Sequence, residues 1–256
     1  SSMRSQRKLG GDQRPIVVNV CNFAKAEPAL LSYDDARTLF HEFGHALHSL
    51  LSEVNYPGLS ETPRDFVEYP SQVHEMWVLT RPILDQFARH YRTNQPMPQA
   101  LVDRINNAGT FNQGYATVEY LSAALIDMKL HLAATSDESI DPDAFERDTL
   151  AQLGMPREIV MRHRTPQFGH VFSGDGYSAG YYSYLWADTL TADAWEAFVE
   201  APRGPWDPGV AAKLTRHVFA AGNTVDPALA YREFRGRDAG TDALMRKRGF
   251  KGDATL

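Results

Sequence analysis

The sequence has 256 residues, of which 43% are hydrophobic and 23% are charged, and this composition is typical of a soluble globular protein with a sizeable core. Its net charge of -6 argues against general binding to nucleic acid or anionic membranes, because phosphate-rich surfaces need a basic partner. No apolar run approaches the roughly 20 residues that cross a bilayer, and no stretch has the pattern of a secretory leader. Cys21 is the single cysteine, which excludes an internal disulfide and favours a cytoplasmic location.

Residues 15–23, "PIVVNVCNF", are rich in β-branched side chains and predict a short buried strand. A lone strand leaves its backbone hydrogen-bonding groups unsatisfied. We therefore expect a partner strand from residues 1–14, from residues 171–176, or from another polypeptide, which includes self-association through the 15–23 strand. The opening "SSMRSQRKLGGDQRP" has neither an initiator methionine nor a capped element, so we also expect a fragment of a longer protein.

Most of the remaining chain has helical periodicity, which predicts a mainly α-helical protein. Ser32 and Asp35 resemble a capping box at the start of the first helix. Apolar residues then recur at helical spacing, and the helix is expected to stop before the turn cluster "NYPG" at 55–58. Further helices are expected at residues 65–90, 112–134, 141–153, 180–199, 208–221 and 240–248.

The first of these helices contains the stretch "FHEFGHALH". Residues four apart lie on the same face of a helix, so His41 and His45 can both direct an imidazole nitrogen at one metal ion. Glu42 projects about 100° away and can reach a water molecule on that ion without binding the ion itself. This is the HExxH arrangement of zinc peptidases. The alternative is a pair of histidines on an ordinary solvated helix face.

A catalytic zinc ion needs three protein ligands and one open position. The extended motif of metzincins is excluded because Leu51 stands where that motif has its third histidine. The third ligand is therefore expected to be a carboxylate from a following helix. Glu53 is too near the end of the same helix and Glu61 lies in a turn-rich connection, whereas Glu68 and Glu75 share a face of the next helix. The residues alone leave both of these open.

Residues 168–186, "FGHVFSGDGYSAGYYSYLW", form a tyrosine segment. Tyr177, Tyr181 and Tyr184 follow the spacing i, i+4 and i+7 of one helical face, and His170 lies just upstream. Aromatic rows at this spacing more often pack in a core. Neutral phenols can, however, donate hydrogen bonds to an oxyanion without binding zinc, and the neighbouring glycines suit closure over a substrate.

The stretches "FHEFGHALH" and "TPRDFVEYPSQVHEMW" (62–77), together with the tyrosine segment, resemble the thimet oligopeptidase–neurolysin family of zinc metallopeptidases, and within it the bacterial dipeptidyl carboxypeptidases. The resemblance covers nearly the whole chain. It implies that one Zn²⁺ per chain is bound by His41, His45 and Glu68. It leaves Glu75 as a candidate to orient a ligand histidine.

The same resemblance implies roles for the remaining candidates. Glu42 is expected to be the general base, and Tyr181, Tyr184 and His170 are expected to contact the tetrahedral intermediate. Tyr177 is expected to contact substrate. Apart from the resemblance, Arg162, Arg164 and Tyr177 are near enough in sequence to be candidates for binding a substrate carboxylate, with surface charges as the alternative for the two arginines. The two further histidines of this region, His48 and His74, are expected to be packing or surface residues.

The resemblance also implies a zincin-like helical catalytic domain over residues 1–256, with a small β element near the N-terminus. In this family such a domain is the C-terminal part of a two-lobed protein, so the missing N-terminal lobe is a candidate partner. The expected activity is hydrolysis of short peptides, with release of C-terminal dipeptides. An endo-acting oligopeptidase of the same family, and a zinc-binding fragment without turnover because the other lobe is missing, are the alternatives.

Overall fold

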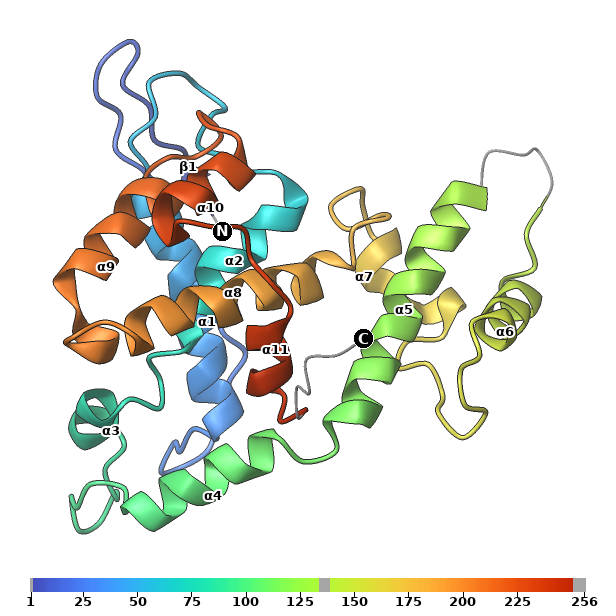
Figure 1. The fold of residues 1–256 in the computed structure, drawn as a ribbon, viewed down its shortest axis with the longest axis horizontal. Coiled ribbons are helices and arrows are strands. Elements are labelled where there is room, and N and C mark those ends of the chain that lie inside the picture. The colour runs from blue at the N-terminus through green and yellow to red at the C-terminus, as the bar shows by residue number, and fades with distance from the viewer. Residues whose placement is uncertain (1, 134–138, 251–256) are drawn as a thin grey trace.

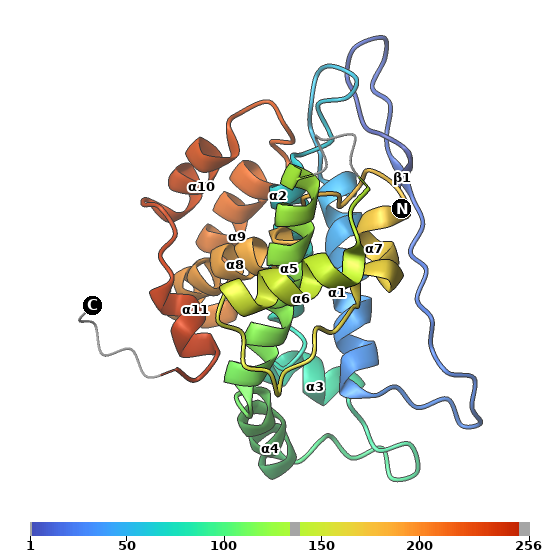
Figure 2. The same cartoon turned by 90° about the vertical axis from the view of Figure 1, so that its right-hand side faces the viewer.

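A computed structural model describes residues 2–133 and 139–250, and helices dominate this part of the chain (Figures 1 and 2). Within the described ranges the sheet is limited to β1 (Ser2–Arg4), which pairs antiparallel with β2 (Ile16–Val17). The mainly α fold with a small β element near the N-terminus is therefore confirmed. None of the described helices is long and apolar enough to span a lipid bilayer.

The predicted strand at residues 15–23 is only partly formed. Its partner lies within residues 1–14, the first of the three predicted sources, and Ser2 stands opposite Val17. Residues 171–176 contain helix and bend instead of a strand. The prediction of a buried strand was wrong, because alternate side chains face solvent, with Ile16 46% and Val20 70% exposed.

Two helices form the centre of the larger part of the molecule. Helix α1 (Tyr33–Leu50) begins with the predicted capping box, in which Ser32 and Asp35 each accept a hydrogen bond from the other's backbone N–H. It packs against α2 (Arg64–Glu75), which in turn packs against α8 (Ser183–Val199). This arrangement buries the main hydrophobic core, which includes Phe66, Tyr69, Val73, Ala187, Leu190, Ala194, Phe198, Leu214, Val218, Phe219, Tyr231 and Phe234.

A second hydrophobic core lies under helices α5 (Gln113–Ala133), α6 (Pro142–Gln152) and α7 (Gly169–Phe172). Figure 1 shows these helices to the right of the α1–α2 pair, with α8 running between the two groups. The core consists of Ala123, Ala124, Ile126, Met161, Phe168, Val171 and Tyr181. The tyrosine segment thus contributes directly to this second core, just before it enters α8.

The other elements differ from the predicted helices in several places. The expected helix at 65–90 is divided into α2 and α3 (Arg81–Phe87). The expected helix at 208–221 is α9 (Pro208–Leu214), continued by the π-helical segment η3 (Thr215–Phe219). The remaining elements are α4 (Gln99–Gly109), the 3-10 turns η1 (Thr165–Gln167) and η2 (Gly204–Trp206), α10 (Pro227–Arg235) and α11 (Asp242–Lys247). Of these, α4 and α10 were not predicted.

Candidate metal centre and active site

Helices α1 and α2 come into close backbone contact at Gly44. A β-carbon at this position would lie 2.6 Å from the Cα atom of Ser71 and 3.0 Å from the carbonyl oxygen of Pro70, so only glycine permits the observed contact. Gly44 directly precedes His45 in α1, and Ser71 lies one turn after Glu68 in α2. The close contact therefore brings the HExxH face of α1 against the carboxylate of α2.

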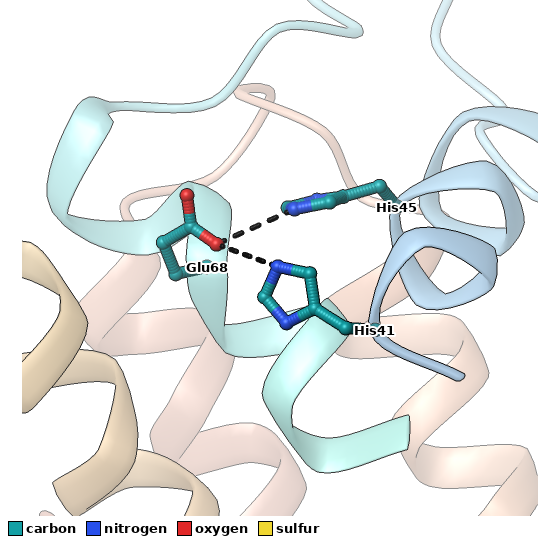
Figure 3. A group of neighbouring side chains, drawn as sticks. All are labelled: His41, His45 and Glu68. Carbon is teal, nitrogen blue, oxygen red and sulfur yellow. Dashed lines mark ion pairs between the residues drawn. The ribbon is translucent and has the colours of Figure 1, made fainter. Parts of the chain in front are cut away.

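Figure 3 shows that His41 and His45, from α1, and Glu68, from α2, point toward the same space. The Nε2 atoms of both histidines lie 3.3 Å from the same Oε2 atom of Glu68. Zinc bonds of about 2.0–2.1 Å in a tetrahedron place neighbouring ligand atoms roughly 3.3–3.4 Å apart. Two imidazoles and one carboxylate at this spacing fit a catalytic zinc site. Among the described residues, no other group of this kind could hold a metal ion.

The electrostatics of the site favour a positive charge at its centre. Burial of Glu68 opposes ionisation, but hydrogen bonds with His41, His45 and Tyr177 outweigh it and hold the pKa of this carboxyl far below its usual range. Burial alone would lower the pKa of His41, yet its contacts with Glu68 and Glu75 raise that pKa to about 9. A group of side chains that stabilises a protonated imidazole in this way also suits a divalent cation.

Glu75 lies on the other edge of the His41 ring. Its Oε1 atom is 2.6 Å from Nδ1 of His41, and its Oε2 atom accepts a hydrogen bond from Nε of Arg37 at 2.5 Å. In the neutral ring, a carboxylate that accepts from Nδ1–H leaves Nε2 unprotonated and able to bind a metal ion. Residue spacing left Glu68 and Glu75 as equal candidates, but their positions around the His41 ring differ. Glu68 lies beside Nε2, the atom that would face a metal ion, and Glu75 lies beside Nδ1.

The neighbouring residues of α1 and α2 are placed as follows. Glu42 is half-buried, and its carboxylate has no hydrogen-bond or ion-pair partner in the part of the chain that the structure describes. It is thus available to accept a proton. His48 is buried against Phe219, and Nδ1 of His74 contacts the carbonyl oxygen of Phe40 at 2.7 Å. Both histidines are packing residues, as predicted.

The tyrosine segment is not one helical face, and that prediction was wrong. Helix α8 begins only at Ser183, so Tyr177 and Tyr181 lie in the turn before it. The rings nevertheless come together, because the turn folds back on the first residues of the helix. The ring of Tyr184 lies 5.4 Å from that of Tyr177, in a stacked arrangement, and 5.6 Å from that of Tyr181.

One phenol of this segment reaches a candidate metal-binding residue, and the imidazole of His170 contacts a second phenol. The hydroxyl of Tyr177 donates a hydrogen bond to Oε1 of Glu68, and Nε2 of His170 lies 2.9 Å from the hydroxyl of Tyr184. Burial raises the pKa of Tyr181 and of Tyr184 above the usual value for a phenol. Both hydroxyls therefore remain protonated, and able to donate, throughout the neutral range.

Arg164 lies away from this group of side chains. Its guanidinium forms ion pairs with Asp143 at 2.8 Å and with Glu146 at 2.5 Å, both on α6. Binding of a substrate carboxylate by Arg164 stays a prediction, although its guanidinium is already paired with two carboxylates of the protein. Arg64, which the sequence did not single out, lies closer to the site, with its guanidinium 4.5 Å from the centre of the Tyr177 ring.

Two further residues that position the site were also missed. Arg37 stands four residues before His41, on the same helix face, and this spacing was a readable signal. Gly44 lies inside the HExxH stretch, where a glycine in the middle of a helix indicates close backbone approach.

Comparison with known proteins identifies the family. The profile of Peptidase family M3 matches residues 1–250. The dipeptidyl carboxypeptidase of Escherichia coli (strain K12) is 40% identical over 241 residues, which are 92% of this chain and 35% of that protein. Oligopeptidase A of the same organism is 34% identical over 260 residues, and saccharolysin of Saccharomyces cerevisiae is 31% identical over 249 residues. These cover 96% and 93% of this chain and 37% and 34% of the relatives, so the chain spans about a third of the length of the curated relatives it matches. This chain belongs to Peptidase family M3.

Proposed function

We propose that this chain is the catalytic part of a zinc metallopeptidase that hydrolyses short peptides, with one Zn²⁺ held by His41, His45 and Glu68. The observation that carries the proposal is the convergence of these three side chains, from two helices, on one point. The names of the relatives support peptide hydrolysis as the reaction class. The donor set of two imidazoles and one carboxylate supports zinc as the metal.

When bound, zinc supplies a Lewis acid that polarises the scissile carbonyl and lowers the pKa of a water molecule. Glu42 would accept a proton from the attacking water and deliver it to the nitrogen of the leaving amine as the C–N bond breaks. Its position next to His41 in α1, with a carboxylate that is not otherwise paired among the described residues, suits this role. Glu75 keeps His41 oriented through its Nδ1 atom.

The tyrosine segment supplies donors for the developing negative charge. Tyr181 and Tyr184 are the proposed hydrogen-bond donors to the oxyanion, and His170 orients the hydroxyl of Tyr184 from 2.9 Å. Tyr177 is proposed to orient a ligand instead. Its hydroxyl donates a hydrogen bond to Oε1 of Glu68, which leaves Oε2 directed at the metal position. A role for Tyr177 in substrate binding would then come from its ring, which faces Tyr184.

The proposal is tested on the purified chain by measuring zinc content together with hydrolysis of an internally quenched peptide, with and without a chelator. We expect about one zinc per chain and hydrolysis that the chelator abolishes. Glu42→Gln should retain zinc and lose about 10²- to 10⁴-fold in turnover, the usual contribution of a general base. Turnover of this variant within tenfold of the wild type would rule out Glu42 as the base. Zinc binding without any hydrolysis by the wild type would favour the alternative of a catalytic fragment that lacks turnover.

We further propose release of C-terminal dipeptides as the mode of cleavage. The 40% identity to a dipeptidyl carboxypeptidase supports it, whereas the 34% identity to an oligopeptidase supports internal cleavage as the second candidate. Dipeptide release requires a group that binds the free carboxylate of the substrate. A peptide and its C-terminally amidated twin should therefore differ strongly in rate, and equal rates would favour internal cleavage.

The partners and the compartment are also proposals. We propose short peptides as substrates and the cytoplasm as the location, which the single Cys21 supports. The exposed side chains of Ile16 and Val20 mark a surface where a preceding lobe, or a second copy of the chain, could add to the sheet. The mass of the chain in solution distinguishes these, because only self-association gives a dimer.

A further inference from the structure

Helix α5 holds the turn of the tyrosine segment through a buried carboxylate. Asp127 is 1% exposed, and its two oxygens accept hydrogen bonds from the backbone N–H groups of Ala179 and Tyr181, each at 3.0 Å. The Oδ1 atom also lies 2.9 Å from Nδ1 of His131, one turn later in α5. Asp127 is therefore bound on both oxygens, and two of its partners are main-chain groups of a segment more than 50 residues away.

The turn needs such an anchor, because its backbone is strained. Ala179 has a φ of 53°, in the left-handed region that residues other than glycine, asparagine and aspartate rarely adopt. Hydrogen bonds to an ionised, buried acceptor are stronger than those between neutral groups, and they offset this local cost. Tyr120 adds a third contact from α5, since its hydroxyl donates to the carbonyl oxygen of Tyr181 and its ring stacks on the Tyr181 ring at 5.2 Å.

These contacts fix both backbone polar groups of Tyr181. The residues around this point are those that face the metal centre: Tyr177, which binds Glu68, precedes the anchored turn, and Tyr184, which contacts His170, follows it in the first turn of α8. A shift of the turn would move these phenols together. Catalytic hydrogen bonds lose much of their effect when donors are misplaced by about 1 Å.

We propose that Asp127 is a positioning residue for the reaction, which fixes the turn that holds Tyr177 and Tyr184 beside the proposed metal ligands. The inference rests on the proposed peptidase function and deepens it. Among the described residues, the hydrogen-bond and ion-pair partners of the Asp127 side chain are Ala179, Tyr181 and His131, none of which is a proposed metal ligand. Loss of Asp127 should therefore lower kcat while zinc content stays unchanged.

The decisive variant is Asp127→Asn, which preserves the shape of the side chain. It replaces one acceptor oxygen with an NH2 donor group that faces a backbone N–H. We expect kcat to fall about 10- to 100-fold, with zinc content equal to that of the wild type. In a Tyr184→Phe background the same substitution should cost less than about threefold, because residues that act through one another are not additive. Full additivity of the two effects, or an unchanged kcat, would overturn the proposal.

Asp193→Asn is the matched control. Asp193 is equally buried, at 1% exposed, and accepts a hydrogen bond from the hydroxyl of Tyr231 at 2.6 Å in the main core. This variant should lower the unfolding temperature and leave kcat within about twofold. If Asp127→Asn fails to fold, Tyr120→Phe tests the same anchor, because it removes the bond to Tyr181 and keeps the stacked ring. An unchanged kcat in Tyr120→Phe would then contradict the proposal.

Hydrogen exchange gives a readout that does not depend on turnover. Asp127→Asn should speed exchange of the amides in residues 177–184 and leave those of α1 and α2 unchanged, both with and without added zinc. Unchanged exchange in residues 177–184 would overturn the anchor even if the chain has no measurable activity. Failure of the proposed function has a different signature, namely a wild-type chain that binds no zinc and hydrolyses no peptide.

Discussion

The proposed metal-binding residues meet the tyrosine segment at the hydrogen bond between Tyr177 and Glu68, but the two groups are held in place differently. The metal-binding half consists of side chains on two regular helices, whose separation is fixed by backbone contact at Gly44. The tyrosine half consists of a turn and the first residues of α8, packs against the second core, and is held by hydrogen bonds from Asp127 on α5. Substitutions in the first half should therefore change metal content, whereas substitutions in the second should change turnover and leave the metal bound.

The largest difference is expected between the two carboxylates of α2. Glu68→Ala removes a proposed ligand, whereas Glu75→Ala removes a partner of His41 Nδ1. Loss of an orienting partner typically lowers metal affinity about 10- to 100-fold, and loss of the ligand should exceed that range. Competition with a chromogenic chelator measures both affinities. Equal zinc content in the two variants would show that the assignment of ligand and orienting residue is wrong.

In the tyrosine half, Tyr184→Phe should lower kcat by about 10²- to 10³-fold, the usual cost of removing one oxyanion donor. Zinc content should not change. Tyr182→Phe is the matched control, because the Tyr182 hydroxyl binds Asp65 at 3.2 Å on the surface. Its kcat should stay within about twofold of the wild type. Loss of zinc from Tyr184→Phe would mean that the two halves are not separable.

The contact at Gly44 offers a test of the metal-binding half that touches no ligand. Gly44→Ala would force a methyl group against Ser71 and Pro70 of α2, and overpacking of this kind costs about 1–3 kcal/mol of stability. Thermal unfolding should show the loss, and zinc affinity should fall with it because the ligands are pushed apart. Gly114→Ala in α5, where nothing lies within 4 Å of the added carbon, should be neutral or stabilising. Equal behaviour of both variants would contradict the role of the close contact.

The same contrast explains how much could be predicted from sequence. The capping box at Ser32 and the pairing of His41 with His45 are local patterns, and the structure confirms both. The expected single helix at 65–90 was wrong, because α2 ends at Glu75 and α3 begins at Arg81. Pro82 in the first turn of α3 indicates a helix start, but the continuous apolar periodicity concealed this signal.

Contacts between distant segments could not be predicted. The spacing of the tyrosines suggested a helix face, whereas their rings gather through a turn that is held by Asp127 on α5. Spacing alone also left Glu68 and Glu75 equivalent, and only the position of each carboxylate around the His41 ring separates them. Sequence periodicity identifies which side chains share a face of one helix. It does not identify which residue from a distant segment contacts and orients those side chains.

The smallest effect is expected at the outer edge of the metal-binding half. Arg37 donates to Glu75 at 2.5 Å, but its side chain is 51% exposed, and ion pairs of this kind contribute only about 0–1 kcal/mol. Arg37→Gln should therefore lower zinc affinity by less than about fivefold, well below the effect of Glu75→Ala. Arg81→Gln, which removes an arginine of comparable exposure that pairs with Asp85 in α3, should leave zinc affinity unchanged. Arg37→Gln could instead weaken zinc binding as much as Glu75→Ala. That result would show that the Arg37–Glu75 ion pair is needed to orient His41, and that packing of α1 against α2 is not sufficient.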